Sequence, residues 1–562
     1  MNKNYNDLGN FISLQRRKRG ISQKDLSKGI ISIATLSRIE SGERTVDKLI
    51  VDTLLQRIGV SADYFEIIIT NIEFILLHQR EQIRIAYNEK KYNRALDLIE
   101  KYEENKGLHL LYFQYAEEIK ARIAIKMGED LKSVCQHLRQ IIQMTVPDFP
   151  NIEWKRCCLS SSEIEIITLF GEIQWKVGRK KEASKIWKHL IDYIHRCDIE
   201  IQEQIKFLPH IRYCMSMQME EEQKLELAIE ECKRGIQMLL QERSLRYLIQ
   251  LLMRMEQLFE KLEKNQGLTY SQNIERMQTR AKIEMFLQIH KMNGLQWDII
   301  YPMQTFQSCY LLSEILQRRR NAMRVIQENI CEDELSVQAL SNIECGKSVP
   351  RKNKNLEKLL KKIYLPPTRY MAYLQGVSME TLDLERKIRK ALNSYDYVKI
   401  RQLLNQLKIT IDQRYSRNQQ FLLYINAIVC LEGKSSMQIL EKLNQALSCT
   451  MPKVKIENWV FTQYESMIIN TIAIVYRKLG KCNEAIELLQ KLSISNQESK
   501  INSIVLHSDS ELTIRNLIKL FEEKGEYQKA IHLYKEVIKR KLVRGEIDLS
   551  LNLYYHNLFV SI

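Results

Sequence analysis

Glycine and proline are scarce in this sequence, whose 562 residues include 18 glycines and 8 prolines. Both residues interrupt regular secondary structure, so their scarcity argues against a fold built from many turns and short strands. Leucine, glutamate, lysine and glutamine are abundant instead, and their straight side chains lose little rotamer freedom in a helix. We therefore predict an all-α protein.

Long apolar runs are also missing. The most apolar stretch, FEIIITNIEFILL at 65–77, is too short to span a bilayer and carries Glu66, Asn71 and Glu73. The opening MNKNYNDLGNF lacks the apolar core of a signal peptide. We therefore expect a cytoplasmic protein that does not engage a membrane.

Patterns that carry catalysis or hold metals are absent as well. The 12 cysteines form no CxxC pair, and no histidine cluster stands near the adjacent Cys157 and Cys158 at metal-ligand spacing. Reduced thiols are therefore expected, rather than disulfides or zinc. The sequence has no Gly-rich phosphate loop and no serine elbow, and its 10 histidines lack paired carboxylates at catalytic spacing. We predict a protein that is not an enzyme and uses no cofactor.

Positive charge is in excess, with 85 lysines and arginines against 69 acidic residues and a net charge of +16. A basic surplus suits a polyanion such as nucleic acid, although a solvated basic surface would give the same balance. The length favours several domains, and 45% hydrophobic residues indicate a globular chain.

Helix pairs recur from about Phe74 onward. Four segments share an aromatic residue, a short polar turn and then an alanine that begins an apolar stripe, namely 86–102, 175–190, 476–492 and 521–537. A small residue at that position lets two helices cross closely. This layout is typical of tetratricopeptide-like (TPR-like) repeats, which stack into a superhelix with a concave face.

The chain also repeats itself on a larger scale. SIATLSRIESGER (32–44) and SVQALSNIECGKS (336–348) share six of thirteen positions at an offset of 304. Further matches extend the similarity along most of the chain: Leu8 with Leu312, Gln23 with Gln327, Ala86 with Ala391, Trp154 with Trp459 and Gly178 with Gly480. We predict a tandem duplication with four domains, at 1–68, 69–305, 306–376 and 377–562.

The first 65 residues predict five short helices around one small core. Gly20 ends the first helix, Ser22 and Asp25 form a capping box for the second, and Ser32 caps the third. The segment 46–60 supplies the last two. Eight apolar residues are spaced to fill the core: Leu8, Ile12, Leu26, Leu36, Ile39, Leu54, Leu55 and Ile58.

The third helix is suited to reading DNA, because a rigid helix fits the major groove while the preceding helix contacts the phosphate backbone. Leu36 and Ile39 should face inward. The predicted DNA-binding residues are Ser22, Gln23, Lys24, Ser32, Ile33, Ala34, Thr35, Ser37, Arg38 and Arg44. Arg16, Arg17, Lys18 and Arg19 should add positive charge around this face, whereas Glu40 fits an internal structural contact.

Residues 8–64 resemble an Xre (Cro/cI-type) helix-turn-helix domain. The hallmarks are Ser22-Gln23-x-x-Leu26 and Leu36-Ser37-Arg38-Ile39-Glu40-x-Gly42, with a shortened turn, GIIS, at 29–32. Followed directly by TPR-like repeats, this domain resembles the RRNPP group of bacterial peptide-pheromone receptors. The resemblance implies a quorum-sensing type of transcription regulator, whose partners are double-stranded operator DNA and a short linear peptide on the concave repeat surface.

The second copy departs from the helix-turn-helix pattern. Arg38 becomes Asn342 and Lys24 becomes Glu328, and the charge of +5 over 14–44 falls to zero over 318–348. Phosphate neutralisation dominates affinity, so we expect this domain to keep its fold and lose most of its grip on DNA. Gln327, Gln338, Asn342 and Lys347, beside Arg318–Arg320, leave some DNA contact open. The duplication could build a pseudo-dimer in one chain, or free the second copy to become a sensor or brake.

Inner helix positions of the second repeat domain supply candidate peptide contacts: Asn470, Arg477, Lys478, Arg515, Asn516 and Lys519. Asparagine amides can bond a peptide backbone and cations can hold a carboxylate, although a solvated helix face would look similar. The equivalent positions of the first repeat domain are Glu165, Thr168, Glu172, Trp175 and Lys176, which predict a different ligand or none.

We conclude from the sequence that the chain is a DNA-binding transcription regulator controlled by a peptide. The alternative is an interaction protein that does not bind DNA, in which the repeats capture a partner and the helical heads serve only for dimerisation.

Overall fold

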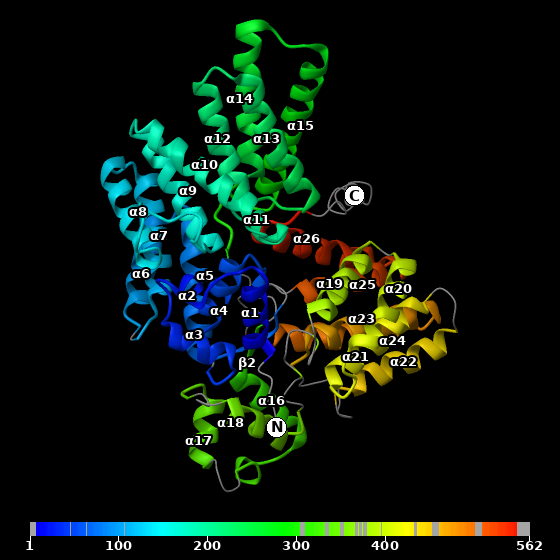
Figure 1. Cartoon of the computed structure of the whole chain (residues 1–562). Coiled ribbons are helices and arrows are strands. Elements are labelled where there is room, and N and C mark those ends of the chain that lie inside the picture. The colour runs from blue at the N-terminus through cyan, green and yellow to red at the C-terminus, as the bar shows by residue number, and fades with distance from the viewer. Residues whose placement is uncertain are drawn as a thin grey trace.

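The computed structural model describes residues 7–44, 46–62, 65–105, 107–303, 309–331, 336–348, 353–365, 369, 374, 379–394, 396–431, 435–451, 460–500 and 508–547. These residues fold almost entirely into helices, and the two strands that they contain are three residues long (Figure 1). This confirms the predicted all-α class. Every helix in the described part of the chain is too short or too polar to traverse a lipid bilayer.

The first domain is a small helical head. Its helices are α1 (Asp7–Lys18), α2 (Gln23–Ser27), α3 (Ile33–Glu40) and α4 (Lys48–Ile58). We expected two helices in 46–60, but no glycine or proline interrupts α4 before Gly59, where the backbone turns left-handed at a φ of 86°. Seven of the eight predicted core residues are buried and Leu8 is half-buried against them.

Five helix pairs follow in the first repeat domain. The first helices of the pairs are α5 (Asn71–Asn88), α7 (Leu110–Met127), α9 (Ser161–Lys176), α12 (Leu208–Glu221) and α14 (Leu248–Gln266). Their partners are α6 (Tyr92–Glu103), α8 (Leu131–Thr145), α10 (Lys180–Arg196), α13 (Leu225–Gln241) and α15 (Tyr270–Met292), with the short α11 (Ile201–Gln204) between pairs. Ala95 and Ala183, at the predicted close crossings, are fully buried. The stacked pairs resemble a TPR solenoid.

The second half begins with a smaller group of elements in the same order as the first head. They are α16 (Leu312–Met323), the 3-10 turn Gln327–Asn329, α17 (Val337–Glu344) and α18 (Asn353–Lys362). Four described helix pairs follow: α19 (Met379–Asn393) with α20 (Tyr397–Thr410), α21 (Ser416–Val429) with α22 (Ser436–Ser448), α23 (Gln463–Lys478) with α24 (Cys482–Gln497), and α25 (Ser508–Glu523) with α26 (Tyr527–Arg544).

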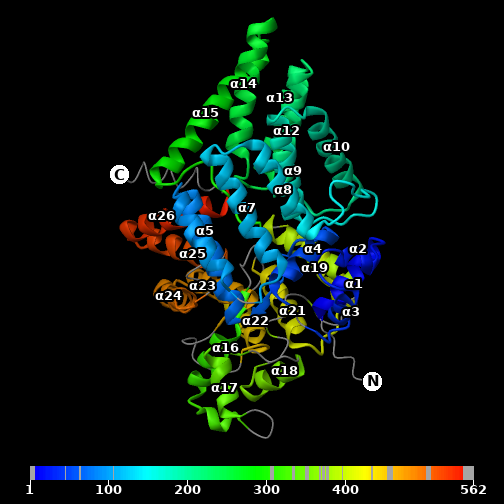
Figure 2. The same cartoon turned by 90° about the vertical axis from the view of Figure 1, so that its left-hand side faces the viewer.

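The two halves pack on each other rather than hanging from a linker. Strand β1 (Ile67–Ile69) pairs in parallel with β2 (Cys309–Leu311). At the far end of the chain, the amide of Leu245 donates to the carbonyl of Gly545 at 2.7 Å, which joins the segment after α26 to the α13–α14 turn. Figures 1 and 2 place α16–α18 at the end of the molecule opposite α14 and α15.

Candidate nucleic-acid interface

Helix α3 presents a mixed polar and apolar face to solvent. It begins at Ile33 because the Ser32 hydroxyl accepts a hydrogen bond from the Thr35 amide at 3.1 Å. Leu36 and Ile39 are buried, as the sequence predicts. The outward residues are exposed or, for Thr35, half-buried: Ser32, Ile33, Ala34, Thr35, Ser37 and Arg38. An isoleucine with 48% of its surface exposed at the start of a helix contributes little to the core and is free to contact a partner.

Helix α2 lies before α3 and starts at the predicted cap. The Ser22 hydroxyl accepts from the Asp25 amide at 3.0 Å and donates to the Asp25 carboxylate at 2.6 Å. The cap is confirmed. The predicted return bond is wrong, however, because the Asp25 side chain takes the serine hydroxyl instead of reaching back to the backbone. Ser22 and Lys24 are exposed, and Gln23 is half-buried.

Glu40 holds α1, α2 and α3 together. It accepts from Arg16 Nε at 2.6 Å, from Arg16 Nη2 at 2.9 Å and from Gln23 Nε2 at 2.9 Å. Burial raises the pKa of Glu40, but the hydrogen bonds from Arg16 and Gln23 outweigh it and leave the pKa below its ordinary value. The predicted structural role of Glu40 is confirmed, and part of Gln23 is committed to it.

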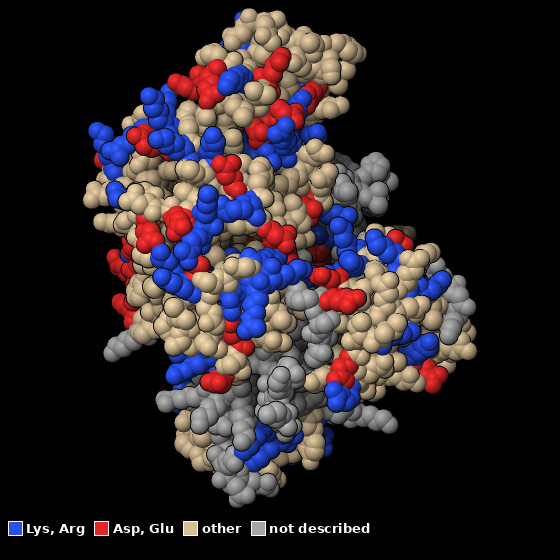
Figure 3. Space-filling model, in the orientation of Figure 1, with Lys and Arg blue, Asp and Glu red and all other residues tan. Residues whose placement is uncertain are grey.

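The positive charge near α3 comes from fewer residues than expected. Arg16 is buried against Glu40, and Arg19 pairs with Asp198 at 3.3 Å with its side chain 12% exposed. Both side chains are engaged within the protein. The prediction that they add positive charge around the outward face of α3 is therefore wrong. The exposed cations that have no ion-pair partner among the described residues are Arg17, Lys24, Arg38 and Arg44. Figure 3 shows basic side chains gathered over the region of α1.

The second half contains the same three-residue network. Arg320 donates to Glu344 at 2.7 and 2.9 Å, and Gln327 donates to Glu344 at 2.7 Å. These residues lie 304 positions after Arg16, Glu40 and Gln23. Ser336 caps α17 through the Ala339 amide at 3.1 Å, as Ser32 caps α3.

The surface of the group α16–α18 is less basic than its sequence suggests. Arg318 pairs with Glu314 at 2.8 Å, Arg319 is buried, and Arg320 is held by Glu344. Gln338 and Lys347 are exposed, and Asn342 is half-buried. The acidic residues Glu332, Asp333 and Glu334 of this group lie outside the described residues.

The predicted peptide contacts of the second repeat domain are largely engaged within the protein. Asn470 is 1% exposed and donates to the Ser466 carbonyl at 2.8 Å and to Thr513 Oγ1 at 3.0 Å. The other candidates have the following contacts: Asn516 donates to Asn470, Arg477 pairs with Glu523, Arg515 pairs with Glu511, and Lys478 donates to the Leu431 carbonyl. Lys519 is exposed. Asn470 and Asn516 thus pack α23 against α25.

The first repeat domain has a pocket of about 310 Å³, partly open to solvent, among the first helices of its pairs. Residues of α5, α7, α9, α12 and α14 line it, among them Tyr87, Arg122, Glu172, Tyr213 and Tyr247. We call this space the concave channel. Sequence reasoning placed Glu165, Glu172 and Lys176 on this inner surface and expected a different ligand or none. Of the remaining predicted inner positions, Thr168 is buried and Trp175 packs on Trp187 at 5.4 Å.

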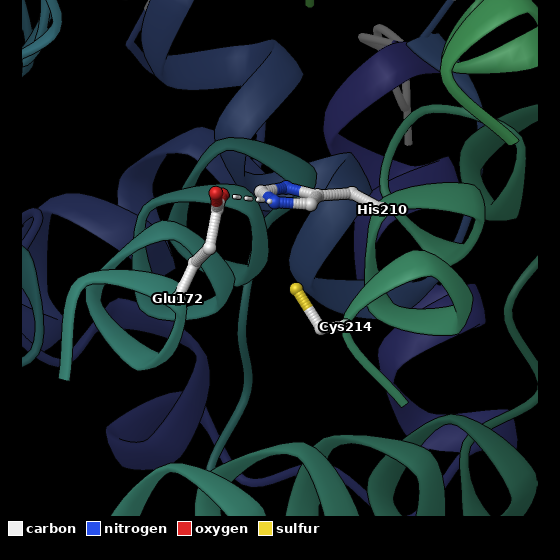
Figure 4. Close-up of side chains that lie close together, drawn as sticks. All are labelled: Glu172, His210 and Cys214. Carbon is white, nitrogen blue, oxygen red and sulfur yellow. Dashed lines mark hydrogen bonds and ion pairs between the residues drawn. The ribbon is translucent and has the colours of Figure 1, made fainter. Parts of the chain in front are cut away.

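A buried histidine contacts Glu165 and Glu172, two residues that line the concave channel; Figure 4 shows it beside Glu172 and Cys214. His210 Nδ1 is 3.0 Å from Glu165, and its Nε2 is 3.1 Å from Glu172. Burial alone lowers the pKa of His210, but the charge of Glu165 and the contacts with Glu165 and Cys214 together outweigh it and raise that pKa well above its ordinary value. A protonated imidazole between two carboxylates fits these contacts.

The contacts of this cluster fit a protonated histidine better than they fit a bound metal ion. Ligand atoms of Glu172, His210 and Cys214 lie within 4.8 Å of one another. A metal-bound imidazole must be deprotonated at the ligating nitrogen, and burial raises the pKa of the Cys214 thiol. Lys176 also pairs with Glu172 at 2.6 Å, so a cation already occupies the neighbourhood of that carboxylate.

Comparison with known proteins first defines the class of the head. Residues 12–65 match the helix-turn-helix family HTH_3, so the chain carries a helix-turn-helix domain of DNA-binding type at its N-terminus. No curated protein matches the chain.

Solved structures similar to this chain include three bacterial regulators. Bacillus thuringiensis PlcR, in complex with the peptide PapR7 and DNA, is 17% identical with a TM-score of 0.33, covering 52% of this chain and 97% of PlcR. The apo quorum sensor NprR from B. thuringiensis is 12% identical with a TM-score of 0.24, covering 87% and 99%. The SHP pheromone receptor Rgg2 from Streptococcus dysgalactiae is 12% identical with a TM-score of 0.15, covering 41% and 99%.

Proposed function

We propose that the chain is a DNA-binding transcription regulator controlled by a short linear peptide, in the manner of quorum-sensing receptors. The observation that carries the DNA-binding part is the open face of α3, beside four exposed cations without ion-pair partners among the described residues. A face that served only for packing would be covered in the folded chain. The helix-turn-helix match at residues 12–65 supports the same assignment.

The proposed roles divide between bases and phosphates. Ser32, Ile33, Ala34, Thr35, Ser37 and Arg38 on α3 contact base edges or the walls of the major groove. Lys24 and Arg44 contact phosphates, with Ser22 and Gln23 beside them at the start of α2. Each neutralised phosphate releases counterions, so the logarithm of affinity should fall with the logarithm of salt concentration by about 0.9 per contact.

We also propose that the chain arose by tandem duplication and that 306–376 is a second, degenerate helix-turn-helix domain. The repeated contacts of Arg320, Gln327 and Glu344 support this proposal, because chance similarity would not reproduce one buried network at one offset. With Arg318, Arg319 and Arg320 engaged inside the protein, this head is poorly suited to neutralising phosphates. It acts instead as a partner of the first head, in a pseudo-dimer or as a brake.

Peptide control is the third part of the proposal. Superhelical repeats bind linear ligands on their concave face, and in the first repeat domain the concave channel is lined by the first helices of the pairs. In the second repeat domain, Lys519 and Lys478 remain candidates for holding a carboxylate. Asn470 and Asn516 would first have to exchange their mutual hydrogen bond for one to the peptide.

Band-shift titrations over a salt series test DNA binding, with Arg38→Ala as the variant and Asn342→Ala as its matched control. Operator DNA comes from fragments selected by the wild-type chain. Arg38→Ala should weaken binding about 10- to 100-fold, the loss typical of one base-reading arginine. Asn342→Ala, at the equivalent position of the second head, should leave binding within about twofold. Equal affinities for the wild type and Arg38→Ala would favour the interaction-protein alternative.

A further inference from the structure

The segment Leu295–Met303, which connects the first repeat domain to the second head, runs along the concave channel. Trp297, Asp298, Ile299, Ile300, Tyr301 and Met303 all line the cavity. The segment belongs to no helix or strand, and its residues from Trp297 to Ile300 are only half-buried. We call it the channel segment.

The backbone of the channel segment is held by side chains of the repeat domain. Asn88 Nδ2 donates to the Ile300 carbonyl at 3.1 Å, while the Ile300 amide donates to Asn88 Oδ1 at 2.8 Å. Arg84 donates to the same carbonyl at 3.0 Å, and Arg246 donates to the carbonyls of Tyr301 and Pro302. A paired amide bond of this kind recognises an extended backbone whatever its side chain.

Two side chains of the channel segment, Asp298 and Tyr301, add specific contacts. The Asp298 carboxylate lies 3.2 Å from Lys126 Nζ and 3.8 Å from Lys90 Nζ. Tyr301 is 8% exposed and packs under the Arg246 guanidinium, whose carbon is 5.6 Å from the ring centroid. The segment therefore presents an acidic residue, then aliphatic residues, then an aromatic residue to complementary partners.

The channel is larger than the segment that lies in it. The cavity of about 310 Å³ beside the segment is also lined by Glu165, Glu172, Lys176 and Gln250, from the deeper inner helices. The channel segment is therefore packed against the repeat domain on one side and borders partly open space on the other. A half-buried segment whose backbone is held by side chains of the repeat domain, with room beside it, is the arrangement of a bound peptide.

We propose that the channel segment is a tethered ligand of the concave channel, and that a free extended peptide of the same chemistry competes with it. The competing peptide carries an acidic residue followed by aliphatic and aromatic residues. This inference rests on the proposed peptide control and adds the site and the internal competitor. Displacement of the channel segment would move the start of the second head, because only five residues separate Met303 from strand β2.

The tether gives the channel segment a strong advantage over a free competitor. Short tethers produce effective concentrations in the millimolar range, so a peptide present at about 1 μM must bind roughly a thousandfold more tightly to displace it. Weakening the segment, with the channel left intact, should therefore open the site to a weak peptide.

Fluorescence anisotropy of a labelled peptide, LQWDIIYPM, with the full-length chain tests the proposal in the absence of DNA. Asp298→Lys changes only the segment and places a third positive charge beside Lys126 and Lys90. This variant should bind the peptide at least about tenfold more tightly than the wild type. Adding Asn88→Ala, which removes the backbone grip, should abolish the gain, and a scrambled peptide should bind neither chain. Unchanged affinity in Asp298→Lys would overturn the proposal.

Hydrogen exchange provides the second measurement, with circular dichroism to establish that each variant is folded. Saturating peptide should speed exchange of residues 295–303 in the wild type, because the Ile300 amide loses its acceptor. If Asp298→Lys does not fold, the milder Asp298→Asn replaces it in both measurements. If exchange of residues 295–303 is the same with and without peptide, the segment is a fixed structural element and the proposal is wrong. These assays contain no DNA, so a negative result would contradict the tethered ligand without affecting the proposed DNA binding. A negative band shift would contradict DNA binding without affecting the tethered ligand.

Discussion

The ionisation of Glu172, in the wall of the concave channel, makes the stability of the fold depend on pH. Its carboxylate accepts a hydrogen bond from buried His210 and pairs with Lys176 at 2.6 Å. Burial raises the pKa of Glu172, but the hydrogen bonds and charges of His210 and Lys176 together outweigh it and lower the pKa from 4.5 to about 2. In the unfolded chain this carboxylate is protonated as pH falls through its ordinary pKa of 4.5. In the folded chain it stays ionised until pH approaches 2.

The stabilisation from Glu172 is therefore complete above about pH 4.5 and is lost as pH falls toward 2. Glu172→Gln should be less stable than the wild type at pH 7 by up to about 3 kcal/mol, and the difference should fade below pH 4.5. Urea titrations followed by tryptophan fluorescence between pH 7 and 3 measure it. The exposed Glu222, paired with Lys224, is the control, because its Gln variant should match the wild type throughout.

Residue types and local spacing predicted the outward face of α3 and the structural role of Glu40. They failed for Arg16 and Arg19, since a count of charges near a helix does not reveal which guanidinium lies under a carboxylate from another helix. Asn470 was misplaced for a similar reason: an asparagine on an inner helix can bond a neighbouring helix as readily as a ligand. Asn88 was overlooked because its partner, Ile300, lies 212 residues away.

At the scale of elements, α4 fixes the head to the first repeat domain through Arg57. Its guanidinium donates to Glu163 of α9 at 2.5 and 3.1 Å and to the Thr145 carbonyl at 3.0 Å. Both side chains of the pair are at most 2% exposed. The head cannot swing freely, so a ligand must act by moving the head together with α9 or by breaking this contact.

Arg57→Ala should loosen the head, because it leaves Glu163 as a buried charge without its cation, at a cost of about 3–5 kcal/mol. Hydrogen exchange across α1–α4 should rise strongly while exchange in α12–α14 stays unchanged. The control is Lys28→Ala, which removes the pair with Asp148 between the same two parts of the chain. Both of those side chains are 48% exposed, so its loss should cost less than about 1 kcal/mol. Similar exchange in the two variants would mean that Arg57 does not hold the head.

Helix pairs were predictable because their signal is local: a turn, an alanine and an apolar stripe recur within each pair. The joining of β1 to β2 was not, since three-residue strands 242 positions apart carry no pattern of their own. The prediction of two helices within 46–60 was wrong: α4 continues to Ile58, because neither glycine nor proline interrupts it before Gly59.

At the scale of the whole molecule, Glu66 is the central contact between the halves. Its carboxylate is buried and accepts from the Tyr310 hydroxyl at 2.9 Å, from the Gln463 amide at 2.7 Å and from Arg417. Glu66 lies between α4 and β1, Tyr310 lies in β2, and Arg417 and Gln463 lie at the start of α21 and α23. One side chain thus joins the first head, the second head and the second repeat domain, so movement of any one of them changes its bonds.

Glu66→Ala should separate the halves, because Arg417 would remain buried without its carboxylate, a loss of about 3–5 kcal/mol. Small-angle scattering should show a larger radius of gyration, and the melting temperature should fall. Replacing both partners, in Glu66→Ala with Arg417→Met, should recover much of the stability, since no charge is then left unpaired. Lys18→Ala is the control: its exposed pair with Asp383, at 3.8 Å, spans the same two halves, and its loss should change neither measurement. If Glu66→Ala keeps the compact dimensions of the wild type, the halves are held by their apolar contacts, and control of the second head must pass through β2 alone.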